Sequence, residues 1–383
     1  VRATVISIYA SGLYIGSGIG IFIGGLIVDN WNNAYPIISE APFGLKGWQV
    51  AFMAVGIPGM LLALLTWQIK EPPRGLSEGL ISSESKNPLK ETFKELVGLT
   101  PFGLVGSDNF KKELSINIIF TVLIFLASYY LYVLTGDFLQ WTAFGIGVYV
   151  ICNWILGLKN RDPVAFLLIF KSKALLLGLL SFPFITFVTY ALGAFGPSFY
   201  IRNFSMTATE VGIIYGLITV FGSMIGVICG GILGDKLRET YVNGKLYLIM
   251  ASAVLTGVTA IGFIHSENLV ASFTWKFVYH IASTAWLGCA ASTVTELVLP
   301  RLRAVASAFF ILMLSMIGLA LGPYLTGMVS DIYINSGLLP GPALKNAMTL
   351  TLVVLVLPFG LLAVACKYLK NDEAEIYEKA RSL

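Results

Sequence analysis

Long apolar runs, separated by shorter polar segments, make up most of the chain. An α-helix of about 20 apolar residues crosses the hydrocarbon core of a bilayer. Ten runs reach that length, at residues 4–28, 48–69, 115–135, 139–158, 174–198, 208–233, 245–264, 269–298, 303–329 and 343–368. The pattern therefore predicts an all-α polytopic membrane protein with ten spans.

The polar segments predict the parts that lie outside the bilayer. Residues 70–112 form the longest of them, and residues 88–98 within it have the apolar spacing of a short amphipathic surface helix. Residues 164–173 are apolar but too short to cross the membrane, so we expect them to lie at its surface.

Composition and charge agree with this pattern. Of the 383 residues 56% are hydrophobic and 12% are charged, whereas a soluble domain carries about 25% charged residues. If residues 1–3 face the cytoplasm, 21 of the 25 Lys and Arg fall in cytoplasmic segments and three on the opposite side. Because positive charge gathers on the cytoplasmic side, we expect a multi-pass protein of an inner or plasma membrane with a cytoplasmic carboxyl terminus. The net charge of +4 gives no indication of nucleic-acid binding.

Residue types that bind metals or perform catalysis are scarce. Each of the four cysteines lies in an apolar run, without the spacing of a metal site or a disulfide framework. Two histidines occur, and no G-x-S-x-G, zinc-binding or phosphate-binding motif is present. We therefore expect neither an enzyme nor a primary pump, and no cofactor or metal ion.

The first and ninth runs are similar to each other. At a constant offset of 302 residues, Gly16, Gly20, Gly25 and Asp29 match Gly318, Gly322, Gly327 and Asp331. Self-similarity between halves is typical of transporters built from repeats. If the halves are equivalent, about four spans precede Val1. We interpret both aspartates as solvated helix ends.

Two six-helix halves joined by a cytoplasmic linker are the plan of the major facilitator superfamily, which the chain resembles in its motifs. Residues 231–236, Gly-Ile-Leu-Gly-Asp-Lys, are similar to that family's Gly-x-x-x-Asp-Arg/Lys loop between helices 8 and 9. The segments that resemble its spinster-like branch are Gly16-Ser-Gly-Ile-Gly20, Gly24-Gly25, Trp48-Gln-Val-Ala-Phe52, Gly56-Ile-Pro-Gly59, Glu71-Pro-Pro-Arg-Gly75 and Pro300-Arg-Leu-Arg-Ala304 with Gly322-Pro323. The resemblance covers residues 1–75 and 174–370.

The resemblance implies a major facilitator-type helical bundle whose first run is the family's helix 5. The parts that we expect are the last two helices of a partial N-terminal half (1–69), a cytoplasmic linker (70–112), an inserted two-helix hairpin (113–160), a complete six-helix C-terminal half (161–370) and a cytoplasmic tail (371–383).

Polar residues inside the spans are candidates for solute contact. Four of them share one arc of the run 269–298, and two lie in the run 174–198. The predicted solute-binding residues are Lys276, His280, Ser283, Thr284, Thr186 and Tyr190. Lys276 would attract an anionic group, and His280 is a hypothetical proton carrier. The alternative, in which Lys276 reaches the outer surface and the other residues pack in the core, stays open.

Charges at the cytoplasmic ends of the spans are candidates for a gate. By analogy with the family, Asp235 would face Arg2 and the amino-terminal dipole of the first span. Glu296 would pair with Arg301 or Arg303. The predicted gating residues are Asp235, Lys236, Arg2, Glu296 and Arg303. For Asp235 an ordinary loop charge is the alternative, and for Glu296 a structural ion pair.

Glycines at four-residue spacing predict a joint between the halves. Such spacing places them on one helix face, where a second helix can approach closely. The first glycine stripe is Gly12, Gly16, Gly20 and Gly24, and the second is Gly222, Gly226 and Gly230. Because helices 5 and 8 meet in the family, we expect the stripes to face each other, antiparallel, as a sliding seam. Bulky residues at Gly20 or Gly226 would then block transport.

Together these features favour a secondary active transporter of a small organic or lipid-like anionic solute, working by alternating access. Whether protons are coupled stays open. The expected partners are the lipid bilayer and the solute, and the expected state is a monomer. A non-transporting receptor or scaffold of the same fold is the alternative, which gradient-driven flux in vesicles would distinguish.

Overall fold

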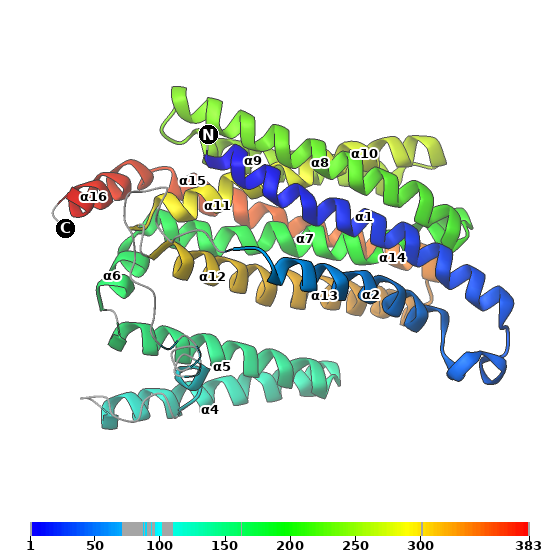
Figure 1. Ribbon diagram of the computed structural model, residues 1–383, viewed down its shortest axis with the longest axis horizontal. Helices are drawn as coiled ribbons and strands as arrows, with labels where there is room; N and C mark the ends of the chain where they lie inside the picture. The colour runs from blue at the N-terminus through cyan, green and yellow to red at the C-terminus, as the bar shows by residue number, and fades with distance from the viewer. Residues whose placement is uncertain are drawn as a thin grey trace. The chain divides into compact units, whose positions relative to one another are not determined.

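The structure, a computed structural model, describes residues 2–70, 87, 89, 93, 96–101, 110–161, 163–299 and 302–381 (Figure 1). Within these ranges the secondary structure is helical, and no β-strand occurs. Nine helical segments of this part are long and apolar enough to cross a membrane. The prediction of an all-α polytopic membrane protein is therefore confirmed.

The helices follow the predicted runs and extend beyond most of them. In chain order they are α1 (Arg2–Ala34), α2 (Gly47–Trp67), α4 (Phe110–Thr135), α5 (Phe138–Arg161), α6 (Pro163–Lys171), α7 (Lys173–Phe204), α8 (Ala208–Thr240), α9 (Gly244–His265), α10 (Leu269–Thr284), α11 (Leu287–Glu296), α12 (Arg303–Met313), the π-helical η6 (Leu314–Leu319), α13 (Ala320–Asn335), α14 (Pro340–Thr351), η7 (Leu352–Leu355), α15 (Val356–Ala365) and α16 (Leu369–Arg381). Most of the linker predicted at 70–112 lies outside the described residues, and so does about half of the helix predicted at 88–98; its described residues, Leu89, Phe93 and 96–98, are helical.

The run 269–298 forms two helices, α10 and α11, which meet at Ala285 and Trp286. Thr284 Oγ1 donates to His280 O at 2.8 Å, and Trp286 Nε1 donates to Ser283 O at 3.0 Å. These side chains therefore form hydrogen bonds with backbone carbonyl oxygens in the last turn of α10. Because Ala285 and Trp286 keep right-handed helical backbone angles, α10 and α11 still cover the predicted run.

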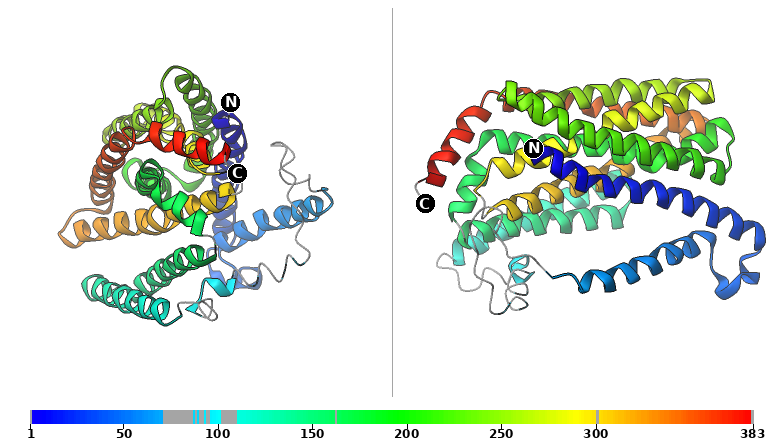
Figure 2. Two further views of the ribbon diagram at one scale, coloured as in Figure 1. Left: turned by 90° about the vertical axis from the view of Figure 1, so that its left-hand side faces the viewer. Right: turned by 45° about the horizontal axis from the view of Figure 1, so that its top comes forward.

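Residues 1–55 and 169–383 form one compact unit, in which α7 is the most buried of the membrane-length helices that the structure describes. Its core side chains Ile185, Val188 and Leu192 are inaccessible to solvent. Other helices of the unit surround α7 (Figures 1 and 2), and α8, α13, α14 and α15 each contact it. This arrangement buries polar as well as apolar residues between neighbouring helices.

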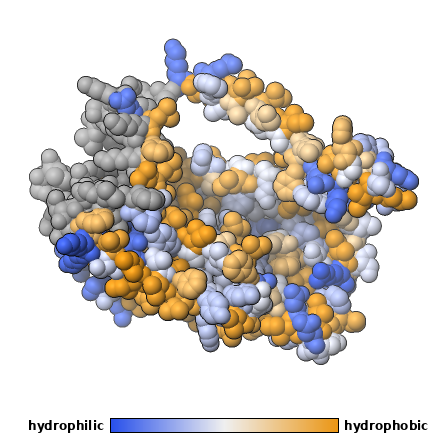
Figure 3. All heavy atoms as spheres, turned by 90° about the horizontal axis from the view of Figure 1, so that it is seen from below, coloured by the Kyte–Doolittle hydropathy of each residue, from blue (hydrophilic) through white to orange (hydrophobic). Residues whose placement is uncertain are grey.

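Apolar side chains also cover outward surfaces of the bundle. On α9, Leu255, Val258 and Ile261 are each about half exposed. In the space-filling view, apolar residues are spread over much of the face drawn (Figure 3). A water-soluble protein rarely exposes so much contiguous apolar surface. In a bilayer, lipid tails contact this surface, so it is not exposed to water. The chain is an integral multi-pass membrane protein.

Residues 56–168 form the second unit, in which α4 and α5 make an antiparallel hairpin. Near its turn, Trp141 Nε1 donates to Thr135 Oγ1 at 2.7 Å. Farther along, Asn117 donates to the buried Asn153, and Tyr149 Oη donates to Asn117 Oδ1 at 3.1 Å. Polar contacts therefore join the two helices at both ends of their interface, as is usual where helices meet inside lipid.

Candidate functional site

Helices α1 and α8 lie side by side and antiparallel (Figure 1). At one end, here called the Asp235 end, the Asp235 carboxylate accepts hydrogen bonds from Ala3 N at 3.3 Å and Thr4 N at 3.0 Å. The hydroxyl of Thr4 donates to the same carboxylate at 2.8 Å. A carboxylate on α8 thus caps the amino terminus of α1, where the helix dipole favours negative charge. Asp235 therefore meets the amino-terminal dipole of the first span, as expected, and its role in a gate stays a prediction.

At the opposite end, here called the Asp29 end, the roles of the two helices are exchanged. Asp29 of α1 accepts hydrogen bonds from Thr209 N at 2.7 Å and from the Thr209 hydroxyl, in the first turn of α8. Each helix therefore carries an aspartate that binds the amino terminus of the other. The interpretation of Asp29 as a solvated helix end is wrong, because Asp29 is half-buried, lies before the end of α1 and binds α8 through Thr209.

Lys245, in the first turn of α9, joins two carboxylates at the Asp235 end. Its Nζ lies 2.6 Å from Glu296 Oε1 and 3.7 Å from Asp235 Oδ1, and it donates to Ser292 Oγ at 2.8 Å. The lysine is only 5% exposed. We call Asp235, Lys245, Ser292 and Glu296 the Asp235 cluster. It links α8, α9 and α11 beside the amino terminus of α1.

The other predicted gating residues lie around this cluster. Glu296 binds Lys245, so its expected pairing with Arg303 is wrong: Arg303 Nε donates to Thr295 O at 3.2 Å. Arg301 lies outside the described residues. Lys236 is exposed, and Arg2 is the first residue of α1.

The two glycine stripes do not face each other. A Cβ atom added at Gly12, Gly16, Gly20 or Gly24 would meet no atom within 4 Å. The second stripe packs against α10 and the α10–α11 junction instead: a Cβ at Gly222 would lie 2.8 Å from His280 Cβ, and one at Gly230 would lie 2.5 Å from Ala285 Cα. The predicted helix pair is therefore the observed one, but the residues predicted for its seam are wrong.

Other small residues form the α1–α8 seam. A Cβ at Gly18 would lie 2.6 Å from Gly216 O, and one at Gly25 would lie 3.0 Å from Ala208 O. Toward the Asp235 end, Ser7 is fully buried in the same interface. A Cβ at Gly231 of α8 would lie 2.8 Å from Ser7 Cβ. The seam thus follows a different face of α1, on which these residues recur at intervals near two or three helical turns.

Lys276 lies in an aromatic core of the bundle. Its side chain is inaccessible, and Nζ has no hydrogen-bond partner among the described residues. Nζ lies 4.1 Å from the ring centroid of Phe263, 4.4 Å from that of Tyr279 and 5.0 Å from that of Tyr215. The expectation that Lys276 could reach the outer surface is therefore wrong, and three ring faces surround its ammonium group.

His280 lies one turn farther along α10 and is 8% exposed. Its Nδ1 is 3.1 Å from Ser223 Oγ, and its Nε2 is 3.4 Å from Thr219 Oγ1. Thr284 Oγ1 donates to Ser223 O at 3.1 Å. With the buried Ser283, these residues pack α10 against α8 in this conformation. Their predicted contact with solute stays a prediction.

The two candidates on α7 differ in their surroundings. Thr186 is buried, its hydroxyl donates to Pro183 O at 2.8 Å, and its Cβ would lie 2.7 Å from a Cβ at Gly318 of η6. Tyr190 is 44% exposed. The close approach of η6 to α7 requires glycine at position 318, whereas Tyr190 stands on an open face of α7.

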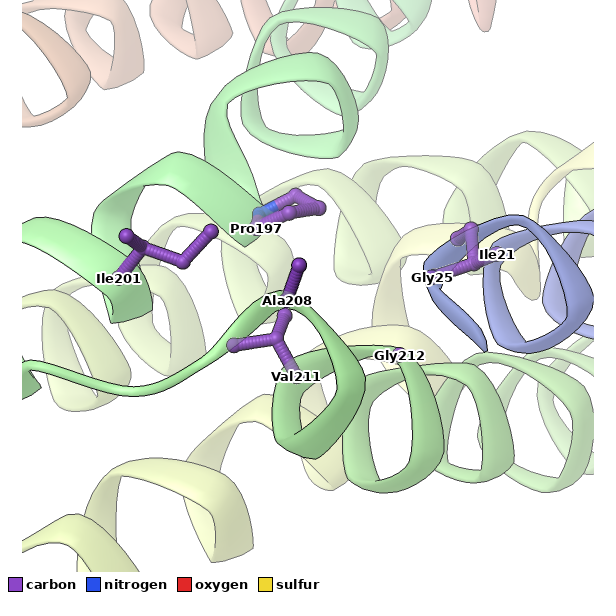
Figure 4. Close-up of a pocket in the computed structure, with 7 residues that line it drawn as sticks. All are labelled: Ile21, Gly25, Pro197, Ile201, Ala208, Val211 and Gly212. Carbon is purple, nitrogen blue, oxygen red and sulfur yellow. The ribbon is translucent and has the colours of Figure 1, made fainter. Parts of the chain in front are cut away.

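A small apolar pocket lies among α1, α7 and α8 near the Asp29 end (Figure 4). Its volume is about 170 Å³, and no polar side chain lines it. The lining residues are Ile21, Gly25, Pro197, Ile201, Ala208, Val211 and Gly212. None of the predicted solute-binding residues belongs to it, and it fits an apolar group rather than a charged one.

Comparison with known proteins identifies the family of this chain. A family model described as the Major Facilitator Superfamily matches residues 1–323. The chain belongs to the major facilitator superfamily. The resemblance inferred from its motifs is thereby confirmed.

Within the superfamily, the relatives include efflux and spinster proteins. An MFS-type efflux pump of Mycolicibacterium smegmatis is 30% identical over 201 residues, which cover 52% of this chain and 45% of that protein. Protein spinster of Drosophila melanogaster is 26% identical over 173 residues, which cover 42% of this chain and 28% of that protein. The chain therefore spans less than half the length of these relatives.

A solved structure shares the fold. It is the crystal structure of a bacterial homolog to the human lysosomal transporter Spinster, in an inward-facing and unoccupied conformation. It aligns with a TM-score of 0.56 at 21% identity, over 96% of this chain and 71% of that one. The fold of that structure thus aligns with nearly the whole of this chain.

Proposed function

We propose that this chain forms part of a spinster-like secondary transporter, which moves a small organic or lipid-like solute by alternating access. The observation that carries the proposal is the Asp235 cluster at the amino terminus of α1. Besides the packing of Ser7 against Gly231, this end of the α1–α8 pair is held closed by hydrogen bonds and ion pairs. Such contacts can be exchanged for water when the end opens, and a gate needs only a small free-energy difference between its states.

The Asp29–Thr209 contact supports the same mechanism at the opposite end. Alternating access requires that each end of the joint can separate while the other remains closed. Two carboxylate caps at opposite ends of one antiparallel pair satisfy this requirement. We assign the Asp235 end to the cytoplasmic gate, in line with the distribution of Lys and Arg, and the Asp29 end to the outer gate.

Two features support an amphipathic anionic solute. The pocket beside the Asp29 end is lined only by apolar residues and suits a hydrocarbon segment. Lys276 is buried with no carboxylate within ion-pair distance among the described residues. An isolated buried ammonium is costly, and a solute anion reaching this layer of the bundle would supply the missing countercharge.

Flux measurements test this proposal directly. The purified protein is reconstituted in vesicles, and gradient-driven uptake is measured for a panel of lysophospholipids, fatty acids and short organic acids. We expect saturable uptake of at least one anionic amphiphile, which Lys276→Met reduces and Lys276→Arg partly retains. Binding of these compounds without flux, in protein that elutes as a folded species, would favour the receptor or scaffold alternative.

A further inference from the structure

The final helix, α16, lies across the Asp235 end of the first unit (Figure 2). The sequence predicts a cytoplasmic tail over residues 371–383. In the structure, Asp372 Oδ2 accepts hydrogen bonds from Ser172 Oγ and Ala174 N, both at 2.8 Å. This contact caps the amino terminus of α7. The Lys173 ammonium also lies 4.8 Å from the ring centroid of Tyr368. Contacts with α7 are therefore made both by the residue before α16 and by its first turn.

The next residue of α16 binds α8. Glu373 forms an ion pair and hydrogen bond with Arg238, and the side chains are 13% and 28% exposed. Arg238 lies about one helical turn beyond Asp235. A second pair, between Glu375 and Lys171 at 2.7 Å, has side chains that are 40% and 62% exposed. The Glu373 pair is therefore the desolvated one, and the Glu375 pair is a surface contact.

Glu373 also belongs to the electrostatic surroundings of the Asp235 cluster. Burial raises the pKa of Glu373, Arg238 on α8 lowers it, Glu296 on α11 raises it and Lys245 on α9 lowers it. The carboxylate of the final helix is therefore close enough to sense both charges of the Lys245–Glu296 pair. Charges of alternating sign run from α16 through α8 and α11 to α9.

We propose that α16 is an element of the gate at the Asp235 end, and that Glu373 is its positioning residue. By holding Arg238, Glu373 fixes the last turns of α8 where Asp235 meets the amino terminus of α1. Asp372 anchors this hold on α7, so that α16 ties α7 and α8 together. The inference rests on the proposed function of the Asp235 cluster as a gate. It adds α16 to the helices that are joined at this end.

The chain provides a reporter for this end of the joint. Ser7 is fully buried between Gly231 of α8 and Gly288 of α11, and its hydroxyl has no hydrogen-bond partner among the described residues. A cysteine at this position reacts with a membrane-impermeant maleimide only when α1 separates from the bundle. The natural cysteines, each replaced by alanine in the parent, are Cys152, Cys229, Cys289 and Cys366.

The experiment compares labelling rates of Ser7→Cys in five backgrounds, without solute: the parent, three variants of the α16 contacts and Asp235→Asn. Glu373→Gln should raise the rate about threefold or more, as expected when one contact of a coupled network is lost. The exchange of charges, Glu373→Arg with Arg238→Glu, should return the rate toward that of the parent. Glu375→Gln, on the same helix, should leave the rate unchanged, because its pair is exposed.

Different outcomes separate this inference from the proposed function. Equal rates for Glu373→Gln, Glu375→Gln and the parent, with Asp235→Asn still accelerating the reaction, would overturn the role of α16 and leave the gate intact. No acceleration by Asp235→Asn would count against the gate itself. Elution profile and thermal midpoint in detergent identify a variant that fails to fold. A failed Glu373→Gln is then replaced by Arg238→Gln, for which the same increase is expected and an unchanged rate overturns the inference.

Discussion

Lys245 shows how one buried charge can organise several helices. It is almost inaccessible, yet its ammonium forms ion pairs with Asp235 and Glu296 and donates a hydrogen bond to Ser292. In the sequence, Lys245 is the first residue of the span predicted at 245–264, and its charge counts toward the cytoplasmic side. Its burial follows from the convergence of α8, α9 and α11, which sequence spacing alone does not define.

Removing the charge of Lys245 should destabilise the fold. Lys245→Met leaves two carboxylates partly buried without their cation, and breaking a buried ion pair costs about 3 kcal/mol. Thermal or denaturant unfolding in detergent measures the change. Adding Glu296→Gln should recover part of the loss. As a control, Lys171→Met removes an exposed pair and should cost less than about 1 kcal/mol. Equal losses for Lys245→Met and Lys171→Met would contradict the assigned burial.

Glu373 should give stability a measurable dependence on pH. Burial, with Glu296, raises its pKa above the ordinary value of 4.5, although Arg238 and Lys245 oppose the shift. The folded state therefore binds this proton more tightly than the unfolded state. Its contribution to the free energy of unfolding increases as pH falls through the raised pKa toward 4.5. Glu373→Gln should remove that slope in thermal midpoints measured across this window, and an unchanged slope would contradict the assignment.

At the scale of the helix, α1 illustrates which features a sequence pattern can predict. Its existence as a spanning helix, its antiparallel pairing with α8 and the position of Asp235 follow from apolar runs and the family motif. Its bounds do not, because the predicted run 4–28 is part of a longer helix, Arg2–Ala34. The face that packs does not follow, because small residues occur on more than one face of this helix. Gly18 and Gly25 meet α8, while Gly12, Gly16, Gly20 and Gly24 face open space. Which face of α1 packs depends on the shape of the α8 surface that it meets.

Two glycine substitutions separate these faces. Gly18→Ala places a methyl group where Gly216 O and Val220 already lie, and overpacking costs about 1–3 kcal/mol. Gly20→Ala meets no atom and should be neutral, or stabilising by up to about 1 kcal/mol through helix propensity. Unfolding in detergent compares them. A larger loss of unfolding free energy for Gly20→Ala than for Gly18→Ala would favour the seam predicted from four-residue spacing.

The repeat-related aspartates provide a second matched pair. Asp29 binds Thr209, whereas Asp331 is exposed at its helix and makes no described hydrogen bond or ion pair. Asp29→Asn should weaken a charge-assisted contact and cost about 1–2 kcal/mol. Asp331→Asn should change stability by less than about 0.5 kcal/mol. Comparable losses in the two variants would show that the Asp29 contact is not the source of the effect.

At the scale of the whole molecule, composition and hydropathy predict the fold class well. Nine of the ten predicted spans appear as apolar helices of sufficient length among the described residues, and the tenth is divided where Thr284 and Trp286 bind backbone carbonyls. The candidate site is predicted less completely. Asp235 is found through a motif, but Lys245, Thr209 and Glu373 act through partners more than 40 residues away. Their roles depend on tertiary packing.

Paired spin-label distances at the two ends of α1 and α8 test alternating access most directly. Labels at the exposed Val5 and Leu233 report on the Asp235 end, and labels at Phe22 and Leu217 report on the Asp29 end. We expect Asp235→Asn to shift the first pair to longer distances while the second pair stays close, and Asp29→Asn to do the reverse. Distances that stay fixed in both variants, or that lengthen at both ends together, would contradict the account.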